Sequence, residues 1–146
     1  MSYTDIDLEI TVPNQTRYLS LIGSIAELLV REIKEYAGDR EALGYHLNLV
    51  LTEALANAIE HSGCRTTNHK QKLRVHIHIE GESLCIQVFD QGSGFDLELV
   101  PDPDFEGMDE RGRGIFFIRS LMDSVNYHRS SNGNCLEMHM KLQQSP

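Results

Sequence analysis

Apolar and polar residues alternate in several parts of the chain, which predicts half-buried β-strands. The first alternation covers residues 8–12 and is followed by Pro13, which ends the expected strand. Two further alternating runs, 73–80 and 84–89, flank a short Gly-Glu-Ser segment. A glycine in such a segment is typical of a turn, so these two runs predict a hairpin.

Helical spacing of apolar residues predicts three helices, separated from the strands by polar or glycine-bearing segments. The first runs from a cap at Asn14 or Thr16 to Gly38, and the second begins near Asp39 and ends at 62–63. The third covers 114–123. A second hairpin should follow it, because an Asn-Gly pair separates two more alternating runs.

This order of elements (β, α, α, ββ, loop, α, ββ) favours an α+β fold. We expect a two-layer sandwich, with helices packed on one face of a mixed, mostly antiparallel sheet. The chain has 146 residues and no internal repeat, so residues 1–146 are expected to form a single domain. The long non-periodic stretch at 90–111 is typical of a binding loop or lid.

Composition narrows the classes of function. The net charge is −9, which argues against general nucleic-acid binding because that needs a basic face. No apolar run approaches the length of a membrane span, and the acidic N-terminus does not resemble a signal peptide. We therefore expect a cytoplasmic protein with no membrane contact. The three cysteines show no CxxC spacing and are expected to be reduced thiols.

Glu53 and Asn57 form the first candidate site. They are four residues apart on the second predicted helix, so they project from the same face, away from its apolar stripe. The Asn oxygen suits a hydrated Mg²⁺, and Glu53 could orient or deprotonate a hydroxyl or water. Solvated Glu and Asn are common on helices, so the pair alone is a weak signal.

The second candidate follows a predicted strand and reads Asp90-Gln-Gly92-Ser-Gly94-Phe95. A carboxylate at a strand end can accept a hydrogen bond from the amino group of a flat base. The two glycines would let the backbone approach a ligand closely. An ordinary Asp-x-Gly turn explains the residues equally well when they are taken alone.

The third candidate, Arg111-Gly112-Arg113-Gly114-Ile115, precedes the last predicted helix. Free backbone N–H groups and the helix dipole favour an anion at such a position, and arginine matches phosphate geometry. The spacing fits neither a Walker A loop nor a Rossmann fingerprint. The alternative is a loop with two solvated arginines.

Taken together and in this order, the three motifs resemble the Bergerat ATP-binding fold of the GHKL superfamily. Within that superfamily the chain is similar to the bacterial anti-sigma-factor serine/threonine kinases of the RsbW type. Two segments carry this resemblance, LTEALANAIEH at 51–61 and ERGRGIFFIRSLMD at 110–123. The similarity extends over about residues 8–142.

The resemblance implies a role for each motif. Asn57 would bind the Mg²⁺ that bridges the ATP phosphates, and Glu53 would be the general base. Asp90 would take the adenine amino group. The remaining expected nucleotide-site residues are the pocket-shaping Gly92, Gly94 and Phe95, the phosphate-flanking Gly112, Arg113, Gly114 and Ile115, and Arg111 near the γ-phosphate. The segment 96–111 would be a short ATP lid.

The resemblance also implies partners. The acceptor would be a small anti-anti-sigma antagonist protein of the STAS type, and the kinase would bind a sigma factor when the antagonist is phosphorylated. Family members often dimerise, and the first helix and strand are the expected surface for a homodimer. Two alternatives remain: a nucleotide-binding module that sequesters a partner with little turnover, and a switch kinase with a non-sigma client. A structural domain whose glycines only form turns is a third.

Overall fold

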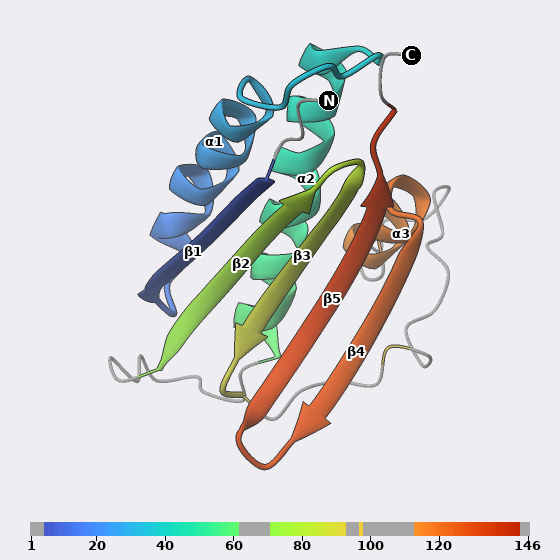
Figure 1. Ribbon diagram of the computed structural model, residues 1–146. Coiled ribbons are helices and arrows are strands. Elements are labelled where there is room, and N and C mark those ends of the chain that lie inside the picture. The colour runs from blue at the N-terminus through green and yellow to red at the C-terminus, as the bar shows by residue number, and fades with distance from the viewer. Residues whose placement is uncertain (1–4, 62–70, 93–96, 98–112, 144–146) are drawn as a thin grey trace.

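The computed structural model describes residues 5–61, 71–92, 97 and 113–143. It shows two layers, a five-stranded sheet and three helices that all lie behind one face of it (Figure 1). The strands are β1 (Asp5–Pro13), β2 (Lys72–Glu80), β3 (Ser83–Asp90), β4 (Ser124–Ser130) and β5 (Gly133–Lys141). The helices are α1 (Leu19–Val30), α2 (Arg40–Glu60) and α3 (Arg113–Leu121), with a 3₁₀ turn at Thr16–Tyr18. The predicted α+β two-layer sandwich is confirmed.

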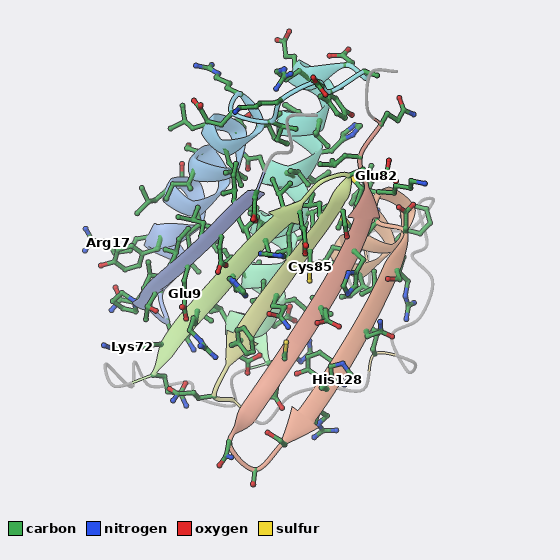
Figure 2. All side chains as sticks on the ribbon, viewed as in Figure 1. Glu9, Arg17, Lys72, Glu82, Cys85 and His128 are labelled. Atoms are coloured by element: carbon green, nitrogen blue, oxygen red, sulfur yellow. The ribbon has the colours of Figure 1, made fainter. Side chains whose placement is uncertain are left out.

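The sheet has the strand order β1-β2-β3-β5-β4. Every described pairing is antiparallel, so the parallel pairing that a mixed sheet would need is not among them. Alternate residues of β2 and β3 are fully buried beneath the helices, as the period-two pattern predicted. The other set points away from the helices and leaves one face of the sheet open. That face is turned to the viewer in Figure 2 and carries Glu9, Cys85 and His128.

Helix α2 crosses the centre of the helical layer and supplies much of its contact with the sheet. Its first turn is capped by the Asp39 side chain, which accepts a hydrogen bond from the Ala42 backbone N–H at 3.0 Å. The predicted start near Asp39 is therefore confirmed. Its buried residues are Leu43, Gly44, Leu47, Val50, Leu51, Ala54, Leu55 and Ala58. None of the described helices is both long and apolar enough to cross a membrane.

The predicted first helix was too long, because α1 ends at Val30 and not near Gly38. The chain turns there to reach α2, and Ile33 still enters the core as part of the turn. Ile33 shares the helical spacing of the apolar residues of α1 because it is buried like them, although it lies outside the helix. The Arg40 guanidinium stabilises the turn, since Nη1 donates to the carbonyls of Val30 at 2.7 Å and Ile33 at 2.5 Å. The first of these bonds ties the last residue of α1 to the first residue of α2.

Replacing Arg40 with alanine should loosen the junction between α1 and α2. One hydrogen bond from a charged donor is worth about 1.5–3 kcal/mol, and Arg40→Ala removes two. Because both come from one partly exposed guanidinium nitrogen, we expect the free energy of unfolding to fall by at least about 1.5 kcal/mol. Urea denaturation measures the change, with Arg31→Ala as the control for an exposed arginine beside the same turn. Equal stabilities for the two variants would contradict this function of Arg40.

Candidate functional site

The Glu53–Asn57 pair lies on the side of α2 that its core packing leaves available. Both side chains are half-buried, next to the fully buried Ala54 and Leu55. The Asn57 Nδ2 atom is buried and has no hydrogen-bond partner in the described part of the chain. A buried amide without a partner is costly, which indicates that something else completes its surroundings. The carboxamide can present its nitrogen or its oxygen there, so a Mg²⁺ or its water fits this position.

Glu53 faces the beginning of α3. A Cβ added at Gly114 would lie only 2.5 Å from Glu53 Oε2, so the third motif meets the first at this point. Only glycine leaves room there for the carboxylate in its present position. Burial raises the pKa of Glu53 above the usual value of 4.5. A carboxylate with a raised pKa is a better proton acceptor for a hydroxyl group.

The start of α3 brings the remaining described residues of the third motif toward α2. Arg113 is the first residue of the helix, and its Nε atom is buried. Ile115 is buried in the core and, with Ile118, anchors the helix. The first N–H groups of a helix attract anions, so this end of α3 can hold a phosphate beside the Glu53 carboxylate.

Asp90 ends β3 and is almost fully buried, with 6% of its surface exposed. Its Oδ1 accepts hydrogen bonds from the Gly92 N–H and from Asn134 Nδ2, both at 2.9 Å. Asn134 Nδ2 also donates to the Gly92 carbonyl at 2.9 Å. These bonds fix the strand end and the Asp-x-Gly turn as one unit. Within the described residues they use Oδ1 alone, which leaves Oδ2 to accept from a ligand.

Asn134 did not appear among the candidates from the sequence. It follows the Asn-Gly turn of the final hairpin and is paired with Asp90 across β3 and β5. A buried asparagine that faces the helices from a strand is the feature that identifies it. The sequence alone does not show this feature, because the register of the sheet decides that Asn134 lies opposite Asp90. Four predicted site residues, Gly94, Phe95, Arg111 and Gly112, lie outside the described residues, as does nearly all of the expected lid.

Leu97 is the one residue of the expected lid segment that the structure describes. It packs against the core, and Arg119 Nη2 of α3 donates to its carbonyl at 3.0 Å. The beginning of this segment is therefore held against the same helix whose first turn faces Glu53.

A family model described as the histidine kinase-like ATPase domain matches residues 12–140, which include α2, β3 and α3. The chain belongs to the histidine kinase-like ATPase domain family. ATP is the nucleotide that such a domain uses, and phosphoryl transfer is the general activity of its kinase members.

Relatives narrow the position of the chain within that family. It is 26% identical over 133 residues to the serine-protein kinase RsbW of Staphylococcus aureus strain JH9, covering 85% of this chain and 80% of the relative. RsbW of the bovine strain RF122 / ET3-1 matches equally well. The resemblance to RsbW-type kinases, which the sequence motifs predicted, is thus confirmed.

Solved structures agree on the fold. The RsbU and RsbW domains of Rv1364c from Mycobacterium tuberculosis superpose with a TM-score of 0.66 at 16% identity. That match covers 97% of this chain and 34% of the longer protein. The catalytic domain of the histidine kinase ThkA superposes with a TM-score of 0.54 at 14% identity, covering 96% of this chain and 99% of that one. Both likenesses concern the fold alone.

A separate pocket of about 420 Å³ lies on the open face of the sheet. It reaches Asp90 and Asn134 at the strand ends, but its outer wall consists of residues that point away from the helices, such as Arg74, Phe89 and His128. Glu53 and Asn57 do not line it. This pocket is therefore not assigned to the nucleotide, because it lies on the other side of the sheet from Glu53 and Asn57.

Removing the Asn134 side chain should destabilise the end of β3 that carries Asp90. Asn134→Ala removes one of the two described hydrogen bonds to the buried Asp90 side chain, and the Gly92 N–H bond remains. It also removes the side-chain donor to the Gly92 carbonyl. We therefore expect a loss of about 1–3 kcal/mol in the free energy of unfolding. Chemical denaturation measures it. The control is Asn126→Ala, which removes an exposed asparagine from the neighbouring strand. A loss no greater than that of the control would show that the Asp90–Asn134 bond is unimportant.

Glu53→Gln should stabilise the protein in a pH-dependent way. Because burial raises the pKa of Glu53 above 4.5, the folded state disfavours the ionised form, and this costs stability as the pH rises from that value through the folded pKa. Glutamine removes the cost, so the gain in Tm should be larger at pH 7.5 than at pH 4. We expect a few degrees at most.

Differential scanning calorimetry at the two pH values checks this prediction. Glu60→Gln, on the exposed end of the same helix, is the control for the loss of a carboxylate as such. If Glu53→Gln gives the same change in Tm at both pH values, the cost of burying the Glu53 charge is absent.

Proposed function

We propose that this chain is an ATP-dependent serine/threonine protein kinase that acts as a partner-switching regulator. It phosphorylates an anti-anti-sigma antagonist of the STAS type and binds a sigma factor in the cytoplasm. The observation that carries the proposal is the approach of Gly114 to the Glu53 carboxylate. It brings a carboxylate of raised pKa to the helix end suited to a phosphate, as transfer to a hydroxyl requires.

Each side chain has a role in this proposal. Asp90 Oδ2 accepts a hydrogen bond from the adenine amino group, while Asn134 and Gly92 hold the carboxylate in place. The first turn of α3, with Arg113 and Gly114, binds phosphate oxygens through its backbone N–H groups. Asn57 would hold the Mg²⁺. The resemblance assigns Arg111 to the γ-phosphate, and this residue lies outside the described part of the chain. Bound Mg²⁺-ATP supplies the phosphoryl group and neutralises charge that develops on it.

Glu53 is the proposed general base. It takes the proton from the serine or threonine hydroxyl of the antagonist while that oxygen bonds to the γ-phosphorus, the bond from phosphorus to the β–γ bridging oxygen breaks and ADP leaves. The raised pKa of Glu53 favours the proton transfer. The partner exchange then follows from affinity differences: a phosphate on the antagonist weakens its binding, and the sigma factor takes its place. The 26% identity to a serine-protein kinase supports this choice of acceptor.

Self-association through α1 is also part of the proposal. Leu21 and Leu28 are seven residues apart, so they project from the same side of α1, and 51% and 57% of their surfaces are exposed. Two large exposed leucines on one helix face are suited to a symmetric helix contact. Phe116 on α3 is also exposed, with 38% of its surface accessible.

Phosphoryl transfer from radiolabelled ATP to candidate antagonist proteins tests the function. We expect the wild type to label its antagonist, and Glu53→Gln to bind Mg²⁺-ATP normally while the labelling rate falls at least about a hundredfold. Gly114→Ala should also slow labelling, because its methyl group would displace the Glu53 carboxylate. Calorimetry with Mg²⁺-ATP measures binding for each variant.

Three results would decide between functions. Nucleotide binding without labelling of any candidate would favour the sequestering module. Equal labelling by wild type and Glu53→Gln would exclude Glu53 as the base. If the wild type does not bind Mg²⁺-ATP, the proposal of a nucleotide site is wrong. Glu60→Gln serves as the matched control for both measurements.

A further inference from the structure

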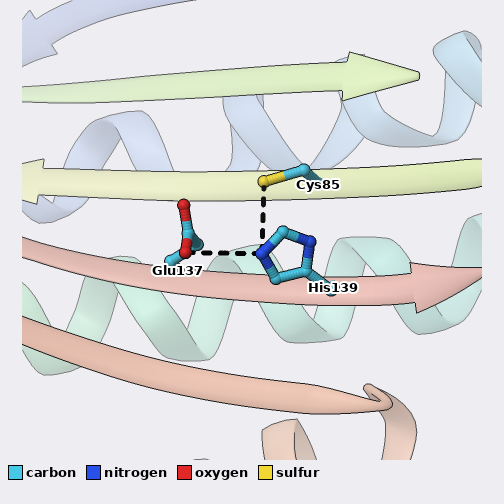
Figure 3. Close-up of side chains that lie close together, drawn as sticks. All are labelled: Cys85, Glu137 and His139. Carbon is cyan, nitrogen blue, oxygen red and sulfur yellow. Dashed lines mark hydrogen bonds and ion pairs between the residues drawn. The ribbon is translucent and has the colours of Figure 1, made fainter. Parts of the chain in front are cut away.

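A cysteine, a glutamate and a histidine meet on the open face of the sheet, away from the helices and the nucleotide site (Figure 3). Cys85 lies on β3, and Glu137 and His139 lie on β5. The His139 Nε2 atom is 3.9 Å from Cys85 Sγ and 3.4 Å from Glu137 Oε2. One ligand atom from each of the three lies within 4.8 Å of the other two.

The sheet itself sets this arrangement. Cys85 and His139 are direct partners in the antiparallel register, so their side chains stand side by side. Glu137 is two residues before His139 and therefore projects from the same face of β5. The three donors need no loop to bring them together, and strands hold ligands more rigidly than loops do.

From these contacts we infer that Cys85, Glu137 and His139 form a binding site for a zinc-like divalent cation. Sulfur, imidazole nitrogen and carboxylate oxygen are the donor types of zinc, whereas Mg²⁺ and Ca²⁺ take oxygen alone. In tetrahedral zinc sites the donor atoms are about 3.3–3.7 Å apart, given the usual bond lengths. The 3.9 and 3.4 Å separations from His139 Nε2 need only small shifts, and Cys85 Sγ lies within 4.8 Å of a Glu137 carboxylate oxygen.

Neighbouring residues already orient the donors. Gln87 Nε2 donates to Glu137 Oε1 at 2.8 Å, which leaves the other carboxylate oxygen facing His139. Gln87 Oε1 in turn lies 3.2 Å from His76 Nδ1, and the other ring nitrogen of His76 contacts Asp7. Both ring nitrogens of His76 can donate in its charged form, and these hydrogen bonds raise the pKa of His76. Such partners behind a ligand hold it in position for a metal.

Within the described residues the cluster has three protein donors, so water or an external ligand completes the coordination there. His78 is the partner of Cys85 on the other side, but its Nε2 lies 3.5 Å from Glu80 Oε2 and serves that contact instead. Binding converts the Cys85 thiol to a thiolate, and the proton passes to solvent while sulfur gives its electron pair to the metal. His139 binds as neutral imidazole, and no redox step occurs.

Metal titration of the full chain, kept reduced and freed of metal by chelator, tests the site without nucleotide. We expect one Zn²⁺ per chain by competition with a coloured chelator, and an increase in Tm on binding. Co²⁺ should give a thiolate-to-cobalt charge-transfer band and the intense visible bands of a tetrahedral ion. Cys85→Ser and His139→Gln should each weaken Zn²⁺ binding by about tenfold or more, and Glu137→Gln by less.

The matched controls are Cys135→Ser and His128→Gln, which stand on the same face but outside the cluster. A Cys64→Ser/Cys135→Ser double variant, in which Cys85 is the sole thiol, should bind as the wild type does.

Absence of Zn²⁺ binding by the wild type would overturn the proposal. So would equal weakening by Cys85→Ser and Cys135→Ser, or a Co²⁺ spectrum without the thiolate band. If Cys85→Ser does not fold, the Co²⁺ spectrum of the Cys64→Ser/Cys135→Ser variant decides. Calorimetry with Mg²⁺-ATP, run on the same proteins, keeps the result separate from the proposed kinase function.

Discussion

The packing of α2 on the sheet is the contact on which the rest of this structure depends. Eight of its residues are buried, and together they fix both the position and the rotation of the helix. Since the rotation is fixed, Glu53 and Asn57 project beside the core, and Glu53 faces the helix that begins at Arg113. If α2 were rotated about its axis by one residue position, the Glu53 carboxylate would move either into the core or out into solvent.

The conditions that suit the proposed chemistry are unfavourable for stability. Glu53 is partly desolvated, Asn57 has a buried amide nitrogen without a described partner, and Asp90 is buried as a carboxylate. Such groups are tolerated because the apolar packing around them is extensive. Asp90 is stabilised by Asn134 and Gly92, whereas Glu53 and Asn57 have polar groups that a nucleotide and its metal ion would complete.

The two faces of the sheet separate two kinds of chemistry. On the covered face, residues at strand and helix ends form the candidate nucleotide site. On the open face, polar side chains form a row of contacts across four strands, from Asp7 through His76 and Gln87 to Glu137. The zinc-like site we infer stands at one end of that row. Strand residues alternate between the two faces of the sheet. Substitutions at one site therefore leave the side chains on the other face unchanged.

Much of the fold followed from the sequence. Period-two alternation predicted the strands, helical spacing predicted the start of α2 near Asp39, and the Asn-Gly turn predicted the last hairpin, because these signals act over a few residues. The sequence also predicted the spacing of Glu53 and Asn57 and the resemblance to RsbW-type kinases. Tertiary structure decided where α1 ends, since Ile33 is buried by a turn that Arg40 completes. It also decided the contact of Gly114 with Glu53, the pairing of Asn134 with Asp90 and the meeting of Cys85 with His139. These residues are 44 to 61 positions apart, and only strand register and helix packing bring such distant residues together.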